Sequence, residues 1–83
     1  MSGSPTATGQ SVVRMANDIA RNFAALGEEQ AIRQTAEHIA LFWDPRMKAA
    51  GFALLARADS GFSPEAGAAL AQLAGEARDS AQG

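Results

Sequence analysis

The chain has 83 residues and a formal net charge of −2, with seven Lys and Arg residues against nine Asp and Glu. It contains no cysteine and one histidine, which excludes disulfides, thiol catalysis, thiolate-bound iron–sulfur clusters and a His-rich metal site. Nucleic-acid-binding domains present a basic face to phosphates, so the acidic balance argues against a nucleic-acid partner. No stretch approaches the ~20 apolar residues of a membrane span and no secretory signal pattern is present, so we expect no membrane contact and a cytoplasmic location.

The apolar content is 47%, but alanine supplies 20 of these residues, and a buried alanine gains little transfer free energy. Chains of this size also bury only ~60–65% of the surface that they expose when unfolded. Hydrophobic stabilisation therefore nearly balances the entropy of ordering the chain. We expect the protein to be stabilised by docking on a larger partner.

Hydrophobic periodicity predicts an all-α fold, with three to four short helices in one domain at residues 10–78. A flexible arm is expected at residues 1–9, which are rich in Ser, Gly and Thr, and a frayed tail at residues 79–83. The first helix is predicted from about Gln10 to Leu26, ended by Gly27. Its apolar residues fall within about 40° of one line on a helical wheel: Val12, Ala16, Ile19, Phe23 and Leu26.

The second helix is predicted from about Glu28 to Trp43, with two glutamates in its first turn, where the helix dipole favours anions. Its apolar stripe consists of Ile32, Ala36, Ile39 and Trp43. This position favours Trp43 as a core residue. Beside the stripe runs a flanking line of Ala31, Thr35, His38 and Phe42.

The chain is expected to turn at Asp44, where Asp is a preferred N-cap and Pro45 suits the first helical position. The third helix is predicted from Pro45 to about Ala58. Gly51 weakens this helix by ~1 kcal/mol relative to alanine unless it permits a close helix crossing. A fourth helix is predicted from Pro64 to about Arg78, because Ser63 and Pro64 repeat the pattern of an N-cap residue followed by proline. It is stabilised mainly by Leu70 and Leu73.

No catalytic constellation is found, because His38 has no carboxylate one helical turn away and no nucleophile–base pair or phosphate-binding loop occurs. The segment from His38 to Met47 instead concentrates Trp, Phe, Met and Arg, the residue types enriched at protein interfaces. Phe42, Arg46 and Phe52 fall off the apolar stripes and are predicted to contact a partner.

Three stretches of sequence are specific enough to suggest a family: Met15–Phe23, Ala36–Ile39 and Phe42–Lys48. Together they resemble the delta subunit of soluble NAD-dependent formate dehydrogenases, over roughly residues 12–55. Met15, Asn17 and Phe23 match the first stretch. The resemblance implies a set of partner-binding residues: His38, Phe42, Trp43, Pro45, Arg46 and Met47. The residue pattern described above adds Phe52 to this set.

The resemblance implies a non-catalytic accessory subunit that binds the large catalytic (alpha) subunit, in a complex that also contains beta and gamma subunits. The parent complex oxidises formate to CO2 at a molybdenum or tungsten bis-pterin centre and passes electrons through iron–sulfur clusters to FMN and NAD. No cofactor, metal site or catalytic residue is expected in this chain. The implied role is assembly and stability of the holoenzyme.

Two alternatives remain open. One is a dedicated maturation chaperone for cofactor insertion that is absent from the finished complex. The other is a helix-turn-helix regulator built across Asp44-Pro45, which would offer Arg46, Lys48 and Arg57 to DNA, although the acidic balance of the chain argues against it.

Overall fold

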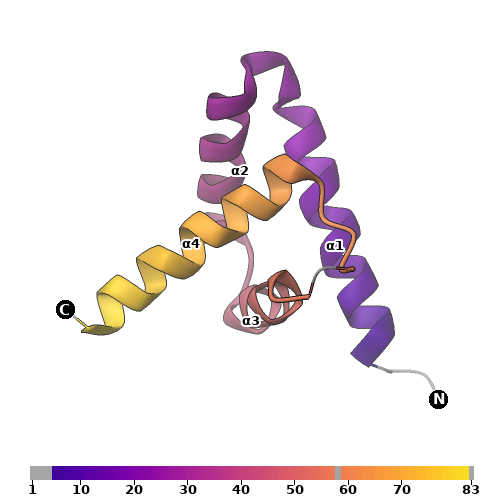
Figure 1. Ribbon diagram of the computed structural model, residues 1–83, viewed down its shortest axis with the longest axis vertical. Helices are drawn as coiled ribbons and strands as arrows, with labels where there is room; N and C mark the ends of the chain where they lie inside the picture. Colours follow the sequence, from indigo (N-terminus) through magenta and orange to yellow (C-terminus); the bar gives the residue numbers. More distant parts are fainter. Residues whose placement is uncertain (1–4, 58, 83) are drawn as a thin grey trace.

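Four α-helices make up most of the molecule in a computed structural model that describes residues 5–57 and 59–82 (Figure 1). They are α1 (Pro5–Asn22), α2 (Glu28–Phe42), α3 (Pro45–Leu55) and α4 (Pro64–Gln82), with a short 3-10 helix η1 (Ala24–Leu26) between the first two. No strand occurs in the described part of the chain, which confirms the predicted all-α fold. None of these helices is both long and apolar enough to cross a membrane.

The first two helices form an antiparallel pair joined by η1 and Gly27 (Figure 1). Gly27 has a φ of 99°, a backbone conformation that glycine adopts without strain, so the predicted break at this residue is confirmed. The predicted start at Gln10 is wrong, since α1 begins at Pro5 within the segment expected as an arm. Proline is favoured in the first turn of a helix. A Cβ on Gly9 would lie 3.4 Å from Leu54 Cδ1, so α1 passes close to α3 at this point.

The end of α1 also differs from the prediction. The Phe23 amide donates to both the Ile19 carbonyl at 3.3 Å and the Ala20 carbonyl at 3.2 Å, which tightens the chain into η1. Because the α-helix ends at Asn22, Leu26 leaves the apolar stripe on which the wheel placed it. Its side chain is 55% exposed.

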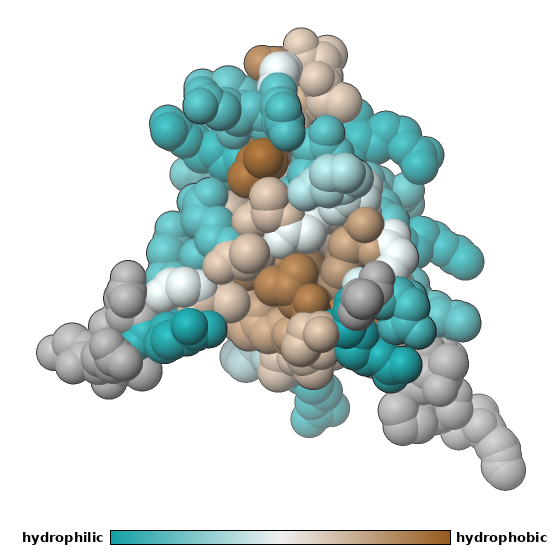
Figure 2. All heavy atoms as spheres, viewed as in Figure 1, coloured by the Kyte–Doolittle hydropathy of each residue, from teal (hydrophilic) through white to brown (hydrophobic). Residues whose placement is uncertain are grey.

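One core joins the faces of α1, α2 and α4. It is rich in alanine, which lets the helix backbones approach closely, and contains Val12, Ala16, Ala20, Ala36, Ile39, Trp43, Ala66, Ala69, Leu70 and Leu73. The predicted stripe of α2 is thereby confirmed, with Ile32 half-buried against this core. Figure 2 shows apolar side chains in the middle of one face of the molecule, with hydrophilic side chains over its flanks.

The third helix packs against both α1 and α4, which explains its unusual apolar pattern. Met47, Phe52 and Leu54 are half-buried against the core, although Phe52 points to a different side of the helix from Met47 and Leu54. Gly51 permits a close crossing, because a Cβ there would lie 3.3 Å from Leu70 Cδ2 and 3.5 Å from Trp43 Cζ3. The helix ends at Leu55, before the predicted end at Ala58, which lies outside the described residues.

The fourth helix crosses α2 diagonally and then extends away from the other helices (Figure 1). The Ala66 amide donates to Ser63 Oγ at 3.2 Å, which confirms the predicted N-cap. Leu73 is its last buried residue among the described side chains, and Ala77 is exposed. The segment 79–82, expected to fray, is helical, because no glycine or proline interrupts it, and Gly83 lies outside the described residues.

Candidate interaction surface

The corner between α2 and α3 is held by one buried side chain and one cap. Trp43, which is 5% exposed, sits in the core directly after α2 and has an extended backbone. Asp44 follows as the N-cap of α3, and its Oδ1 accepts a hydrogen bond from the Met47 amide at 2.8 Å. The Lys48 ammonium donates to the Ala40 carbonyl at 2.9 Å and so ties the start of α3 to the end of α2. These contacts set the arrangement of the two helices at the corner.

Four exposed residues surround this corner and form what we call the corner surface: Leu41, Phe42, Pro45 and Arg46. Leu41 is 72% exposed and Phe42 is 71% exposed, the highest values among the large apolar side chains described. Phe and Arg are among the residue types enriched at protein interfaces.

His38 lies beside the corner surface and supports it. Its ring centroid is 4.7 Å from that of Phe42, with the rings tilted by 40°. His38 is half-buried, so the contact limits where the exposed Phe42 ring can move. A restrained aromatic side chain loses less conformational entropy on binding than a free one.

The structure divides the predicted partner-binding residues into two groups. His38, Phe42, Pro45 and Arg46 lie together at the corner, where a partner can reach them. Trp43, Met47 and Phe52 pack against the chain's own core, because α1 and α4 cover α3 from two sides. The expectation that Phe52 lies off the core is wrong, and Trp43 offers a partner almost no surface.

Two residues were missed in the sequence: Leu41, which belongs to the corner surface, and Asn17, which has a tertiary role. Leu41 lies nine positions after Ile32, about 180° around the helix, so the wheel already placed it opposite the core stripe. Asn17 was named only as part of the first stretch that carries the family resemblance. Its side chain in fact joins α1 to the connection before α4, with Oδ1 accepting from the Ser63 amide at 2.8 Å and Nδ2 donating to the Gly61 carbonyl at 3.0 Å.

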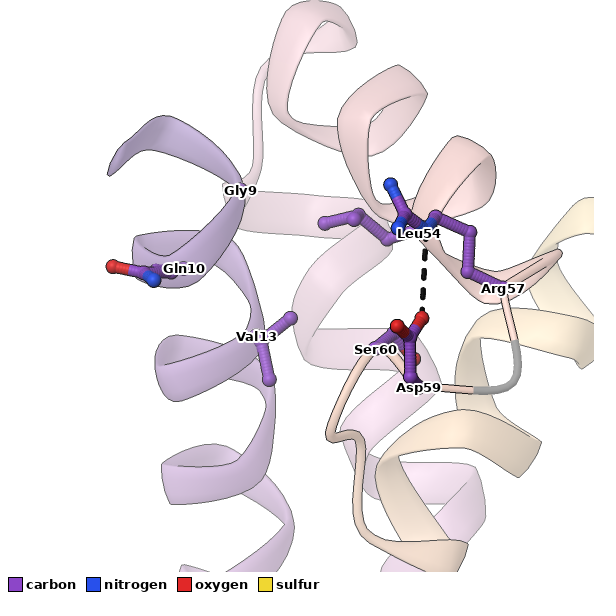
Figure 3. A pocket seen from close by; sticks show the side chains of 7 residues that line it. All are labelled: Gly9, Gln10, Val13, Leu54, Arg57, Asp59 and Ser60. Atoms are coloured by element: carbon purple, nitrogen blue, oxygen red, sulfur yellow. Dashed lines mark ion pairs between the residues drawn. The ribbon is translucent and has the colours of Figure 1, made fainter. Parts of the chain in front are cut away.

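The remaining surface offers shallow hollows. One of about 500 Å³ lies between α1 and the end of α3, where Val13 and Leu54 point inward from opposite sides and Arg57 pairs with Asp59 (Figure 3). Another lies between α2 and α4, near Ala40 and Leu73. Within residues 5–57 and 59–82, no three His, Asp or Glu side chains gather as metal ligands would. The exposed apolar corner is suited to binding another protein.

Comparison with known proteins gives one family. The sequence profile of the NADH-dependent formate dehydrogenase delta subunits (FdsD) matches residues 11–70. No curated protein and no solved structure matches the chain. The matched region extends past Leu55 to Leu70, so it includes the corner surface, both partners of the Asn17–Ser63 contact and the buried half of α4.

Proposed function

The chain belongs to the family of NADH-dependent formate dehydrogenase delta subunits, and we propose that it is a non-catalytic accessory subunit that binds the large catalytic subunit in the cytoplasm. The observation that carries this proposal is the pair of exposed apolar side chains Leu41 and Phe42 beside Arg46 at the corner between α2 and α3. Burying Leu41 and Phe42 would remove from water the two most exposed of the large apolar side chains described.

The mechanism is stabilisation by binding. A subunit that binds only the folded form of its partner raises that partner's stability by mass action, without any chemistry of its own. The exposed apolar surface contributes the affinity, and Arg46 contributes orientation by pairing with a carboxylate on the partner. The small, alanine-rich core fits this role, since docking also stabilises the accessory subunit itself.

We assign the redox chemistry to the other subunits of the complex. Formate oxidation at a molybdenum or tungsten bis-pterin centre, iron–sulfur clusters, FMN and NAD belong to the alpha, beta and gamma subunits in this proposal. The residues of this chain support that assignment, since it has no cysteine to ligate an iron–sulfur cluster.

Affinity capture of the tagged chain from its host tests the proposal, with mass spectrometry and metal analysis of the captured material. We expect stoichiometric recovery of the catalytic subunit together with bound molybdenum or tungsten. Recovery of a metal-free catalytic subunit alone would instead identify a maturation chaperone. Recovery of neither would contradict both functions.

Four variants locate the interface in the same experiment. Phe42→Ala and Arg46→Glu should each reduce capture of the catalytic subunit while the helix content of the isolated chain stays unchanged. Leu26→Ala and Arg33→Glu are the controls: the first also truncates an exposed apolar side chain, and the second makes the same charge reversal, both at exposed positions away from the corner. Equal losses in all four variants would contradict binding through the corner surface.

A further inference from the structure

A groove runs along α1 on a different part of the molecule from the corner surface. It consists of two adjoining hollows, of about 500 and 300 Å³, which share Gln10, Val13 and Ser60. Val13 and Leu54 give it an apolar base, and the connection from α3 to α4 forms its second wall (Figure 3). Together the two hollows extend along α1 from Gly9 to Arg21.

The second wall is held in place by α1 itself. The Asn17 side chain binds the Gly61 carbonyl and the Ser63 amide, at 3.0 and 2.8 Å. Gly61 has a φ of 95° and lies so close to α1 that a Cβ on it would be 3.6 Å from Val13 Cγ1. A groove whose two walls are already joined needs little ordering when a ligand binds.

The charges along the groove favour an anion. Arg14 and Arg21 line one hollow and Arg57 lines the other, against the two carboxylates of Asp18 and Asp59. The groove thus carries one net positive charge in a chain whose net charge is −2. Arg57 pairs with Asp59 at 3.5 Å, but both side chains are exposed, and such surface pairs are weak enough to exchange partners.

We propose that this groove binds an extended, acidic segment of a partner protein. Arginine binds carboxylates through two parallel hydrogen bonds, and three arginines along one groove can bind successive carboxylates of a peptide. From Gln10 to Arg21 the helix rises about 16 Å, which matches about five residues of extended chain. This second binding site is separate from the corner surface and does not depend on the function proposed above.

The test uses the full chain and a fluorescein-labelled polyglutamate peptide of about six residues, with binding followed by fluorescence anisotropy. We expect saturable binding that weakens at high salt. The double variant Arg14→Gln/Arg21→Gln should weaken it by about tenfold, since two charge-assisted contacts are lost. Arg33→Gln/Arg78→Gln removes the same charge from exposed positions outside the groove, and should retain affinity within about twofold.

The proposal would be overturned by no binding of polyglutamate, by equal losses in both double variants, or by tighter binding of a polylysine peptide. Chemical shifts of the Asn17 side-chain amide and the Val13 methyl groups locate the bound peptide directly. Shifts confined to α2 or to the end of α4 would also contradict it. Phe42→Ala should leave peptide binding unchanged, so this test is independent of the corner surface.

Discussion

The Asn17 side chain and the Ser63 backbone are joined across 46 positions of sequence, with the Ser63 amide donating to Asn17 Oδ1 at 2.8 Å. Ser63 in turn caps α4 through its own hydroxyl, which accepts from the Ala66 amide. Asn17 thus fixes the position at which α4 begins, and α4 supplies four residues of the core. One polar residue on α1 therefore positions a helix that contributes almost half of the buried apolar set.

Replacing Asn17 by alanine should lower the free energy of unfolding by about 1–3 kcal/mol. The half-buried Ser63 amide would lose its partner, and the Gly61 carbonyl would lose its donor. Chemical denaturation followed by circular dichroism measures the change. Asn22→Ala, an exposed asparagine at the end of the same helix, is the control, and equal effects of the two substitutions would show that the Asn17 contacts contribute nothing.

Trp43 and Phe42 are adjacent in sequence, and we expect opposite consequences when each is replaced by alanine. Trp43→Ala removes a core side chain and should cost about 3–5 kcal/mol, enough to unfold much of so small a domain. Phe42→Ala changes a side chain that is 71% exposed and should alter stability by less than about 0.5 kcal/mol. Thermal unfolding of both variants measures the difference in stability. A Trp43→Ala protein as stable as the unmodified chain would contradict the core role of Trp43.

Two helical glycines should respond differently to alanine. Gly75 has no neighbouring atom within 4 Å of an added Cβ, so Gly75→Ala should raise stability by up to about 1 kcal/mol. At Gly51 the added Cβ would lie 3.3 Å from Leu70 Cδ2, so this fully buried side chain would have to shift within a packed core. Gly51→Ala should therefore leave the stability of the protein unchanged or lower it. The midpoints of urea unfolding compare this variant with Gly75→Ala. A gain at Gly51 equal to that at Gly75 would mean that the α3–α4 crossing is looser than described.

The hydroxyl of Thr35 is buried and has no hydrogen-bond partner among the described residues. Thr35→Val keeps the shape of the side chain and removes the unpaired oxygen, so it should stabilise the fold by about 1 kcal/mol. Thr35→Ser is the converse control, because it keeps the hydroxyl and deletes a buried methyl group, and it should destabilise. Denaturant titrations of the two variants give the sign of each change, and a destabilised Thr35→Val protein would indicate that the hydroxyl is bonded.

Much of the fold was predictable because its signals are local. The starts of α3 and α4 are set by capping contacts that span only three residues, at Asp44-Pro45 and at Ser63-Pro64. Gly27 interrupts the helical conformation between α1 and α2. The stripe of α2 also depends only on helical periodicity. For the candidate site, the same reasoning placed Phe42 and Arg46 off the core, where the structure has them.

The flanking line of α2 shows where local pattern stops being sufficient. Ala31 and Thr35 on this line are fully buried, whereas His38 is half-buried and Phe42 is exposed. Helical periodicity gives all four the same direction, and only the placement of the neighbouring helices covers one end of the line and leaves the other open.

The sequence by itself determined the four helices, the starts of α2, α3 and α4, and the family, because periodicity, caps and specific short stretches are properties of the chain. Only the tertiary structure decided that α3 lies between α1 and α4, which buries Met47 and Phe52, and that Asn17 binds the connection before α4. These features depend on contacts between different helices and connections, and the free energy of such contacts is set by packing and desolvation, which have no local signature in sequence.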